Sequence, residues 1–193
     1  MDITISLYFP TWKTERLIMR PFDRADAVFF SSLMTGDVAR TLSTIPFPFD
    51  FPQAMGWICL WQRRCAAGQG IACTVIHRGI IIGAVTLECV SVFETSVAEL
   101  RYWYGRPYWG RGFATEAAYG IATYAFVHLG VERLRARHLV GNGASGRVLT
   151  NIGMRSVGIE RNAVFHWNAF HDVIFYSMQK DDLAALPRAA AVS

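Results

Sequence analysis

Charged residues are scarce in this chain of 193 residues, at 18% against roughly 25% in an average soluble domain. Hydrophobic residues reach 52%, which excludes an intrinsically disordered protein. Internal repeats and linkers are also missing, and the length suits one well-filled core. We therefore expect one domain over residues 1–193, with a core at about 12–180 and a disordered C-terminal tail at 183–193.

Long hydrophobic runs are absent as well. The longest apolar stretches, Ile80–Val85 and Ala117–Val131, fall short of the ~20 residues that a membrane helix needs, and His128 interrupts the second. The first residues lack the basic region, apolar core and cleavage site of a secretory signal. These absences exclude a membrane-spanning protein and predict a cytoplasmic one.

Signatures of metal sites and disulfides are lacking too. The four cysteines, at positions 59, 65, 73 and 89, form no Cys-x-x-Cys pair and have no histidine at zinc-finger spacing. We expect reduced, mostly buried thiols and no metal. The net charge of +4 is too small and scattered for a nucleic-acid binder, and it suits a small anionic ligand.

The hydrophobic periodicity predicts an α+β class with a mixed sheet. Turn residues and apolar spacing place helices at 23–34, after Pro52 and up to Gly68 or Gly70, from Phe113 to Gly130, and at 145–151. Strands are expected at 14–21, 71–77, 80–90, 98–104, 133–140 and 172–178, with a tight turn at Arg78-Gly79.

The most informative segment runs from Glu99 to Ala117, where a strand passes through a glycine-bearing loop into a helix. Amides at a helix start have no intrahelical partner and lie at the positive end of the helix dipole, so a phosphate binds there readily. Thr115 at the third site argues against a dinucleotide fingerprint, and no Gly-Lys-Ser or Gly-Lys-Thr follows the loop as a P-loop requires.

Several motifs in order resemble the GNAT superfamily of acetyl-CoA-dependent N-acetyltransferases, especially its ribosomal-protein (alanine/serine) N-terminal acetyltransferase branch. The resemblance covers nearly the whole chain and departs from the family pattern at Pro107. The matching segments are Thr14–Pro21, Trp57-Ile58, Ala98–Trp103, Tyr108–Ala117, Asn142–Ser145 with Arg147–Leu149, Gly153-Met154, and Asp172.

The resemblance implies a mostly antiparallel sheet of six to seven strands, splayed between Leu100–Tyr104 and Leu134–Val140 and flanked by helices. The pantetheine arm of acetyl-CoA, the cosubstrate, would lie in the gap. Arg106, Arg111 and Arg147 are expected near its phosphates. The implied cofactor-binding residues are Trp103, Tyr104, Trp109, Gly110, Arg111, Gly112, Phe113, Ala114, Thr115, Asn142 and Ser145. Ser145 would lie near the thioester sulfur, or could simply cap the helix that follows.

Acetyl transfer to an amine needs a base for the ammonium and a donor for the oxyanion. Glu99 is the first choice as base, although Arg101 on the same strand face could hold it in a plain ion pair. Glu88, Glu160, His138 and His166 are the alternatives, and His138 and Asp172 also fit structural roles. The backbone N–H of Tyr104 is the candidate oxyanion donor.

The general acid is the open part of the site. Many members of the superfamily carry a tyrosine where this chain has Leu149. With a thiol pKa near 8.5, the thiolate can leave unaided or take a proton through Ser145 or water. The catalytic set expected from the sequence is therefore Glu99, Ser145 and Tyr104.

Three functions stay open on the sequence alone. They are an acetyltransferase acting on a protein N-terminal amine or a small amine, a non-catalytic acyl-CoA-binding module, and an interaction protein that uses the 13% of aromatic residues. Phe47, Phe49 and Trp61 could line an acceptor pocket or pack between helices. Nucleic-acid and membrane partners are not expected, and a homodimer is possible.

Overall fold

A single eight-stranded sheet organises the computed structural model, which describes residues 10–43, 45–91 and 96–184. The strand order is β1-β2-β3-β4-β5-β6-β8-β7. The strands are β1 (Trp12–Lys13), β2 (Leu17–Pro21), β3 (Gly70–His77), β4 (Ile80–Ser91), β5 (Val97–Tyr104), β6 (Arg133–Leu139), β7 (Arg155–His166) and β8 (Ala169–Gln179). The helices are α1 (Ala27–Leu33), α2 (Gly36–Ala39), α3 (Phe51–Ala66), α4 (Phe113–His128), α5 (Gly143–Asn151) and α6 (Lys180–Ala184).

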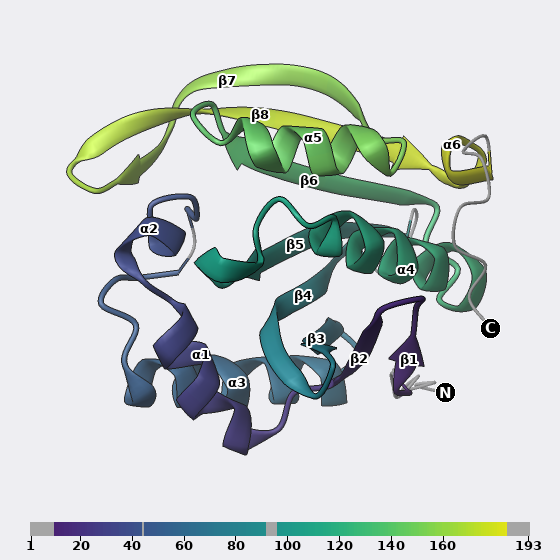
Figure 1. The fold of residues 1–193 in the computed structure, drawn as a ribbon. Coiled ribbons are helices and arrows are strands. Elements are labelled where there is room, and N and C mark those ends of the chain that lie inside the picture. Colours follow the sequence, from purple (N-terminus) through teal and green to yellow (C-terminus); the bar gives the residue numbers. More distant parts are fainter. Residues whose placement is uncertain (1–9, 44, 92–95, 185–193) are drawn as a thin grey trace.

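Two helical layers cover the sheet from opposite sides (Figure 1). Phe30 of α1 and Ile58 of α3 pack with Trp103 on one side of β5. Ile121 of α4 and Leu149 of α5 pack with the residues that β5 presents to the other side. β5 therefore runs through the middle of the molecule, with a separate hydrophobic cluster on each of its faces.

The sheet opens between β5 and β6, the one parallel pair among the described strands. These two strands pair only through Val97–Glu99 and Arg133–Arg135. Beyond that point they diverge, so Leu100–Tyr104 keeps only β4 as a sheet neighbour. The predicted splay of a mostly antiparallel sheet is confirmed.

Local sequence signals explain the boundaries of the elements. Asp50 and Gln53 form a capping box at the start of α3. The turn at Arg78-Gly79 has φ values of 50° and 78°, as a tight two-residue hairpin turn requires. Gly130, at φ 64°, follows the last turn of α4 and ends the helix there.

Some expectations about the elements were wrong. The sheet has eight strands rather than six or seven, because β1 and the long β7 carry no clean alternation of apolar and polar residues. α5 begins at Gly143, two residues earlier than expected, because Asn142 caps it. The expected tail overlaps α6, in which Leu183 is buried, while residues 185–193 lie outside the described part of the chain.

All four cysteines are free thiols. Cys73 is buried, whereas Cys59, Cys65 and Cys89 are only partly buried, so the expectation of mostly buried thiols was too strong. Burial raises the pKa of the Cys73 thiol well above its usual range. The Cys73 thiol is thus unreactive at neutral pH.

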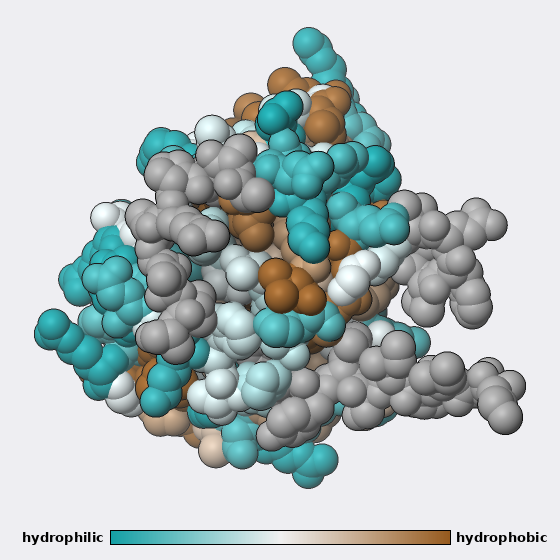
Figure 2. Space-filling view, turned by 90° about the vertical axis from the view of Figure 1, so that its right-hand side faces the viewer, coloured by the Kyte–Doolittle hydropathy of each residue, from teal (hydrophilic) through white to brown (hydrophobic). Residues whose placement is uncertain are grey.

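The face beside β1, α6 and the end of α4 shows hydrophobic residues in separate patches between hydrophilic ones (Figure 2). Among the described residues, no helix has both the length and the apolar character to cross a membrane. A cleft lies in the interior of the molecule, between β5 and β6.

Candidate active site

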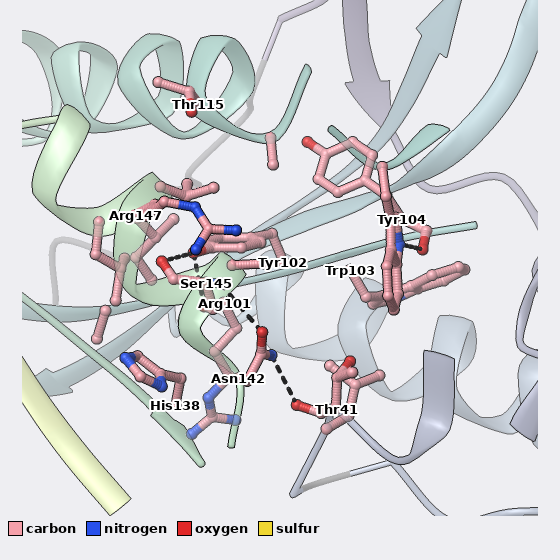
Figure 3. Close-up of a pocket in the computed structure, with 18 of the residues that line it drawn as sticks. Thr41, Arg101, Tyr102, Trp103, Tyr104, Thr115, His138, Asn142, Ser145 and Arg147 are labelled. Carbon is pink, nitrogen blue, oxygen red and sulfur yellow. Dashed lines mark hydrogen bonds between the residues drawn. The ribbon is translucent and has the colours of Figure 1, made fainter. Parts of the chain in front are cut away.

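A cleft of about 400 Å³ occupies the gap where β5 and β6 diverge. Its walls are β5, β6, the start of α4, the face of α5, and the segment Thr41–Ser43 that follows α2. Figure 3 shows side chains from these separate elements converging on one space. The volume suits an extended small-molecule arm rather than a folded partner.

The start of α4 forms one end of the cleft, where it leaves backbone amides open. Gly110 and Gly112 adopt φ values of 72° and 78°, a left-handed conformation that favours glycine. The first bond of the helix runs from the Glu116 N–H to the Gly112 carbonyl, and Gly112, as the N-cap, offers no side chain. The amides of Phe113–Thr115 therefore have no acceptor within the helix.

A clamp outside the cleft holds this loop in place. The Glu116 carboxylate accepts hydrogen bonds from Thr14 Oγ1 (2.5 Å), Arg16 N (2.8 Å) and Arg16 Nε (2.7 Å). Arg16 Nη1 also donates to the Arg111 carbonyl at 3.0 Å. Partial burial would raise the pKa of Glu116, but these hydrogen bonds outweigh it and hold the pKa below its usual value. Glu116 is therefore an ionised anchor between β2 and α4.

The backbone of β5 turns toward the cleft near its end. The Gly105 N–H bonds to the Ile82 carbonyl on β4, so the alternation of an antiparallel pair turns the groups of Tyr104 away from β4. The Tyr104 carbonyl accepts from the indole Nε1 of Trp109 at 2.7 Å. This bond fixes the entrance loop to the strand and leaves the Tyr104 N–H directed at the cleft.

One face of β5 carries an ion-pair network. Glu99 Oε1 lies 3.1 Å from Arg101 Nε and 3.3 Å from Arg137 Nε on β6. Arg101 also pairs with Glu88 at 2.9 Å, and Glu88 pairs with Arg64 of α3 at 2.6 Å. The expected pairing of Glu99 with Arg101 is present, and Arg137 joins it from the opposite wall of the cleft.

The other face of β5 is neutral. Tyr102 extends to α5, where its Oη lies 2.9 Å from Ser145 Oγ and 3.2 Å from the Ser145 carbonyl oxygen (Figure 3). Burial raises the pKa of the Tyr102 phenol well above its ordinary value, against the smaller opposing effect of the Ser145 hydrogen bond. The phenol is therefore protonated throughout the physiological range.

Asn142 connects two walls of the cleft. Its Oδ1 accepts from the Ser145 N–H at 3.1 Å and so caps α5. Its Nδ2 donates to the Thr41 carbonyl at 3.3 Å, in the segment after α2. The alternative that Ser145 caps the helix is thus wrong, because Asn142 does so and leaves the Ser145 hydroxyl to face Tyr102.

Comparisons with known proteins identify the family. The model of the acetyltransferase (GNAT) domain matches residues 16–155, which is more than half of the chain. This chain belongs to the GNAT acetyltransferases. The chain transfers an acetyl group from acetyl-CoA to an amine. Membership of this family does not favour the alternative that the protein only binds acyl-CoA.

Individual relatives agree with this assignment. The Bacillus subtilis (strain 168) protein named "Putative ribosomal N-acetyltransferase YdaF" is 30% identical over 120 residues, or 62% of this chain and 65% of that protein. The match thus spans just under two thirds of that relative. An "Uncharacterized N-acetyltransferase p20" of Bacillus licheniformis is 28% identical over 90% of this chain and 98% of its own length. A solved structure, "Crystal structure of Probable acetyltransferase", has a TM-score of 0.81 at 27% identity, over 90% of this chain and 98% of that one.

The GNAT cleft gathers most of the residues singled out from the sequence. Arg111 does not line it, and contributes its carbonyl to Arg16 instead. Arg106 stacks on Trp109 with its guanidinium carbon 4.7 Å from the ring centre, and only Arg147 of the three expected arginines lines the cleft. The predicted residues that do line it are Glu99, Trp103, Tyr104, Trp109, Gly110, Gly112, Phe113, Ala114, Thr115, Asn142 and Ser145.

The alternative bases lie in other surroundings. His138 is buried, with Nδ1 2.8 Å from the Leu139 carbonyl, which can only accept, and Nε2 3.4 Å from Tyr176 Oη. Glu160 is exposed on β7, and His166 bonds to the Ala39 carbonyl at 3.2 Å. Asp172 accepts from the Asn162 N–H and orders the β7–β8 hairpin. Of these groups, only His138 also lines the cleft.

The aromatic candidates for an acceptor pocket divide into two kinds. Phe49 and Trp61 are buried in the cluster beneath α1 and α3, as the packing alternative predicts. Phe47 is exposed and stacks on Trp167 of the β7–β8 turn, with ring centres 5.4 Å apart. Sequence reasoning missed Tyr102 and Arg137 as cleft residues, because their roles depend on how α5 and β6 pack against β5.

Proposed function

We propose that this GNAT acetyltransferase acetylates the N-terminal amine of a protein or peptide, with small-molecule amines as the alternative acceptor class. The observation that carries the proposal is the cleft between the diverging strands β5 and β6, which has the open amides of the α4 start at one end. The Glu99 carboxylate also lines this cleft, on the face of β5 opposite to Tyr102. The relative named "Putative ribosomal N-acetyltransferase YdaF" supports a protein acceptor.

The residues present fit acetyl-CoA. The Trp109 N–H already donates to the Arg106 carbonyl, so Gly110–Thr115 are the residues that offer successive amides to the pyrophosphate. A Cβ at Gly110 would meet only open space, so a ligand can approach the backbone there. Arg147 lines the cleft and carries a guanidinium that can pair with a phosphate. The unpaired edge of β5 offers hydrogen bonds to an extended amide-bearing arm, as a neighbouring strand would.

The proposed chemical roles follow the two faces of β5. Glu99 takes the proton of the acceptor amine, directly or through water, while Arg101 and Arg137 fix the position of its carboxylate. The Tyr104 N–H donates to the developing oxyanion of the thioester. Ser145 lies beside the position of the sulfur.

The proposal also covers the setting of the enzyme. We place it in the cytoplasm as a single acetyltransferase domain over residues 1–193. The need for acetyl-CoA and the four free thiols support this location. A homodimer is compatible with the sequence and is tested by light scattering.

A binding and turnover experiment tests the function. Acetyl-CoA at millimolar concentration is expected to raise the melting temperature and change the tryptophan fluorescence, since Trp103 and Trp109 line the cleft. Release of free thiol is then followed with N-terminal peptides of ribosomal proteins, polyamines, amino acids and aminoglycosides. A chain that binds no acetyl-CoA, or that releases no thiol with any acceptor, would contradict the proposal.

A further inference from the structure

Two hydroxyl groups meet where the walls of the cleft face each other. Tyr102 comes from β5 and Ser145 from α5, and both line the cleft. Figure 3 shows the Tyr102 side chain crossing toward Ser145. The phenol oxygen is 2.9 Å from Ser145 Oγ and 3.2 Å from the Ser145 carbonyl oxygen. The pair thus connects β5 with α5 across the cleft that opens where β5 and β6 diverge.

The hydrogens of this pair can be counted. The phenol has one hydrogen and two acceptors in reach, of which Ser145 Oγ is the nearer. When the phenol donates to Oγ, the hydroxyl hydrogen of Ser145 is free to point into the cleft. A donor that itself accepts a hydrogen bond is polarised and donates more strongly.

The buried phenol is a hydrogen-bond donor and not a proton source. Burial raises the Tyr102 pKa well above the ordinary value of about 10, while a thiol has a pKa near 8.5. Full proton transfer from Tyr102 to a thiolate would therefore run uphill. Donation of a hydrogen bond has no such cost and favours the negative sulfur.

Resting on the acetyl transfer proposed above, we propose that Tyr102 is a positioning residue that directs the Ser145 hydroxyl hydrogen at the sulfur of the departing CoA thiolate. In this step the amine nitrogen forms the C–N bond, the C–S bond breaks, and its electron pair stays on sulfur. Tyr102 and Ser145 keep their protons throughout. The thiolate takes a proton from water, and the amine proton goes to the base on the other face of β5.

Leu149 leaves α5 without a phenol at the position where many superfamily members have one. Leu149 stands where many superfamily members carry a tyrosine, one helical turn after Ser145, and the two residues share one face of α5. Leu149 has no polar group, but it is buried and lines the same cleft. Tyr102 brings a phenol to this region from the opposite wall.

Substitution of the hydroxyls tests the inference. Tyr102→Phe is expected to lower kcat about 10- to 100-fold with KM for acetyl-CoA changed less than twofold, as for loss of a donor to a charged group. Ser145→Ala should lower kcat similarly, and the double variant should be no worse than Ser145→Ala, because Tyr102 acts through Ser145. Tyr119→Phe, a matched change on α4 outside the cleft lining, should keep the wild-type rate.

A binding measurement separates this role from mere support of the fold. The pKa of the CoA thiol in the binary complex is measured from thiolate absorbance, with the complex of a CoA analogue lacking sulfur as the blank. It should lie below that of free CoA in the wild type and rise toward it in both Tyr102→Phe and Ser145→Ala. If Tyr102→Phe left the thiol pKa at the wild-type value, or had a kcat within twofold of the wild type, the inference would be overturned while the proposed function stayed intact. A wild type that binds no CoA would overturn both.

Discussion

The two faces of β5 differ in kind although their residues alternate along one strand. Glu99 and Arg101 point to a network of partly exposed ion pairs that reaches α3 and β6. Tyr102, the residue after Arg101, points to the opposite side, where its phenol bonds to the hydroxyl and the carbonyl of Ser145. The period of two in a strand thus places a charged group and a neutral donor on opposite sides of one backbone.

This difference suits a reaction with two unlike proton requirements. An ammonium must lose a proton, which a carboxylate can accept, while a departing thiolate needs only a hydrogen-bond donor. Glu99 and Tyr102 cannot interfere with each other because the strand lies between them. A single rigid strand therefore keeps both groups in register with the Tyr104 N–H.

The largest expected effect comes from displacing the shared strand. A Cβ at Gly83 of β4 would overlap the Trp103 carbonyl oxygen and come within 2.9 Å of the Tyr104 Cα. We expect Gly83→Ala to lower the free energy of unfolding by about 3 kcal/mol, measured by urea denaturation, and to impair both faces together. Gly56→Ala is the control, since its Cβ would meet open space on α3. Unchanged activity in Gly83→Ala would show that the faces do not depend on the strand position.

The second largest effect is expected from Glu99, on the face of β5 that carries the ion pairs. Glu99→Gln should lower kcat at pH 7 by about 10²- to 10³-fold because it removes the proposed base but keeps the shape of the side chain. Binding of acetyl-CoA, measured by thermal shift, should remain. Full turnover at pH 7 would exclude Glu99 as the base and leave it as a structural ion pair.

A smaller effect concerns the neutral face at alkaline pH. The raised pKa of Tyr102 means that the unfolded chain releases this proton above pH ~10 while the folded chain keeps it. Stability is then lost as pH rises, by about 1.4 kcal/mol per unit for this one group. Because the unfolded phenol is only half ionised at pH 10, Tyr102→Phe should lose about 1 kcal/mol less than the wild type between pH 10 and 11 in urea unfolding. Equal losses in the two proteins would show that the phenol is open to solvent.

The smallest effect is expected at the far end of the ion-pair network. Glu88 pairs with Arg64 and Arg101 but does not line the cleft. Glu88→Gln should cost less than about 1 kcal/mol in stability, as is usual for partly exposed pairs, and should change kcat less than threefold. If Glu88→Gln lowered kcat as much as Glu99→Gln does, the loss of activity would come from the whole ion-pair network and not from Glu99 as a base.

Much of the fold could be predicted because its signals are local. The apolar stripe of α4, the Arg78-Gly79 turn and the alternation along β5 each depend on a few neighbouring residues. β7 could not be predicted in this way, since it is an edge strand exposed over most of its length. Two register shifts, near Gly158 and before Val164, also break its alternation.

In the site, too, the local features could be predicted and the long-range contacts could not. The anion loop at Gly110 and Gly112 is continuous in sequence, so its glycines and helix start could be recognised together. The contact of Tyr102 with Ser145 joins residues 43 positions apart, and it depends on the packing of α5 over the end of β5. Alternation could place Tyr102 opposite Glu99, but it could not show which hydroxyl would meet it.

The clamp of Thr14 and Arg16 on Glu116 also affects the electrostatic potential of the phosphate site. A carboxylate in the first turn of α4 would by itself weaken the attraction of that helix end for an anion. Arg16 lies 2.7 Å from this carboxylate and compensates its charge, so the positive potential at the free amides is preserved. We therefore expect the affinity for a phosphate-bearing ligand to depend on Arg16, which directly precedes β2 and which the ligand need not touch.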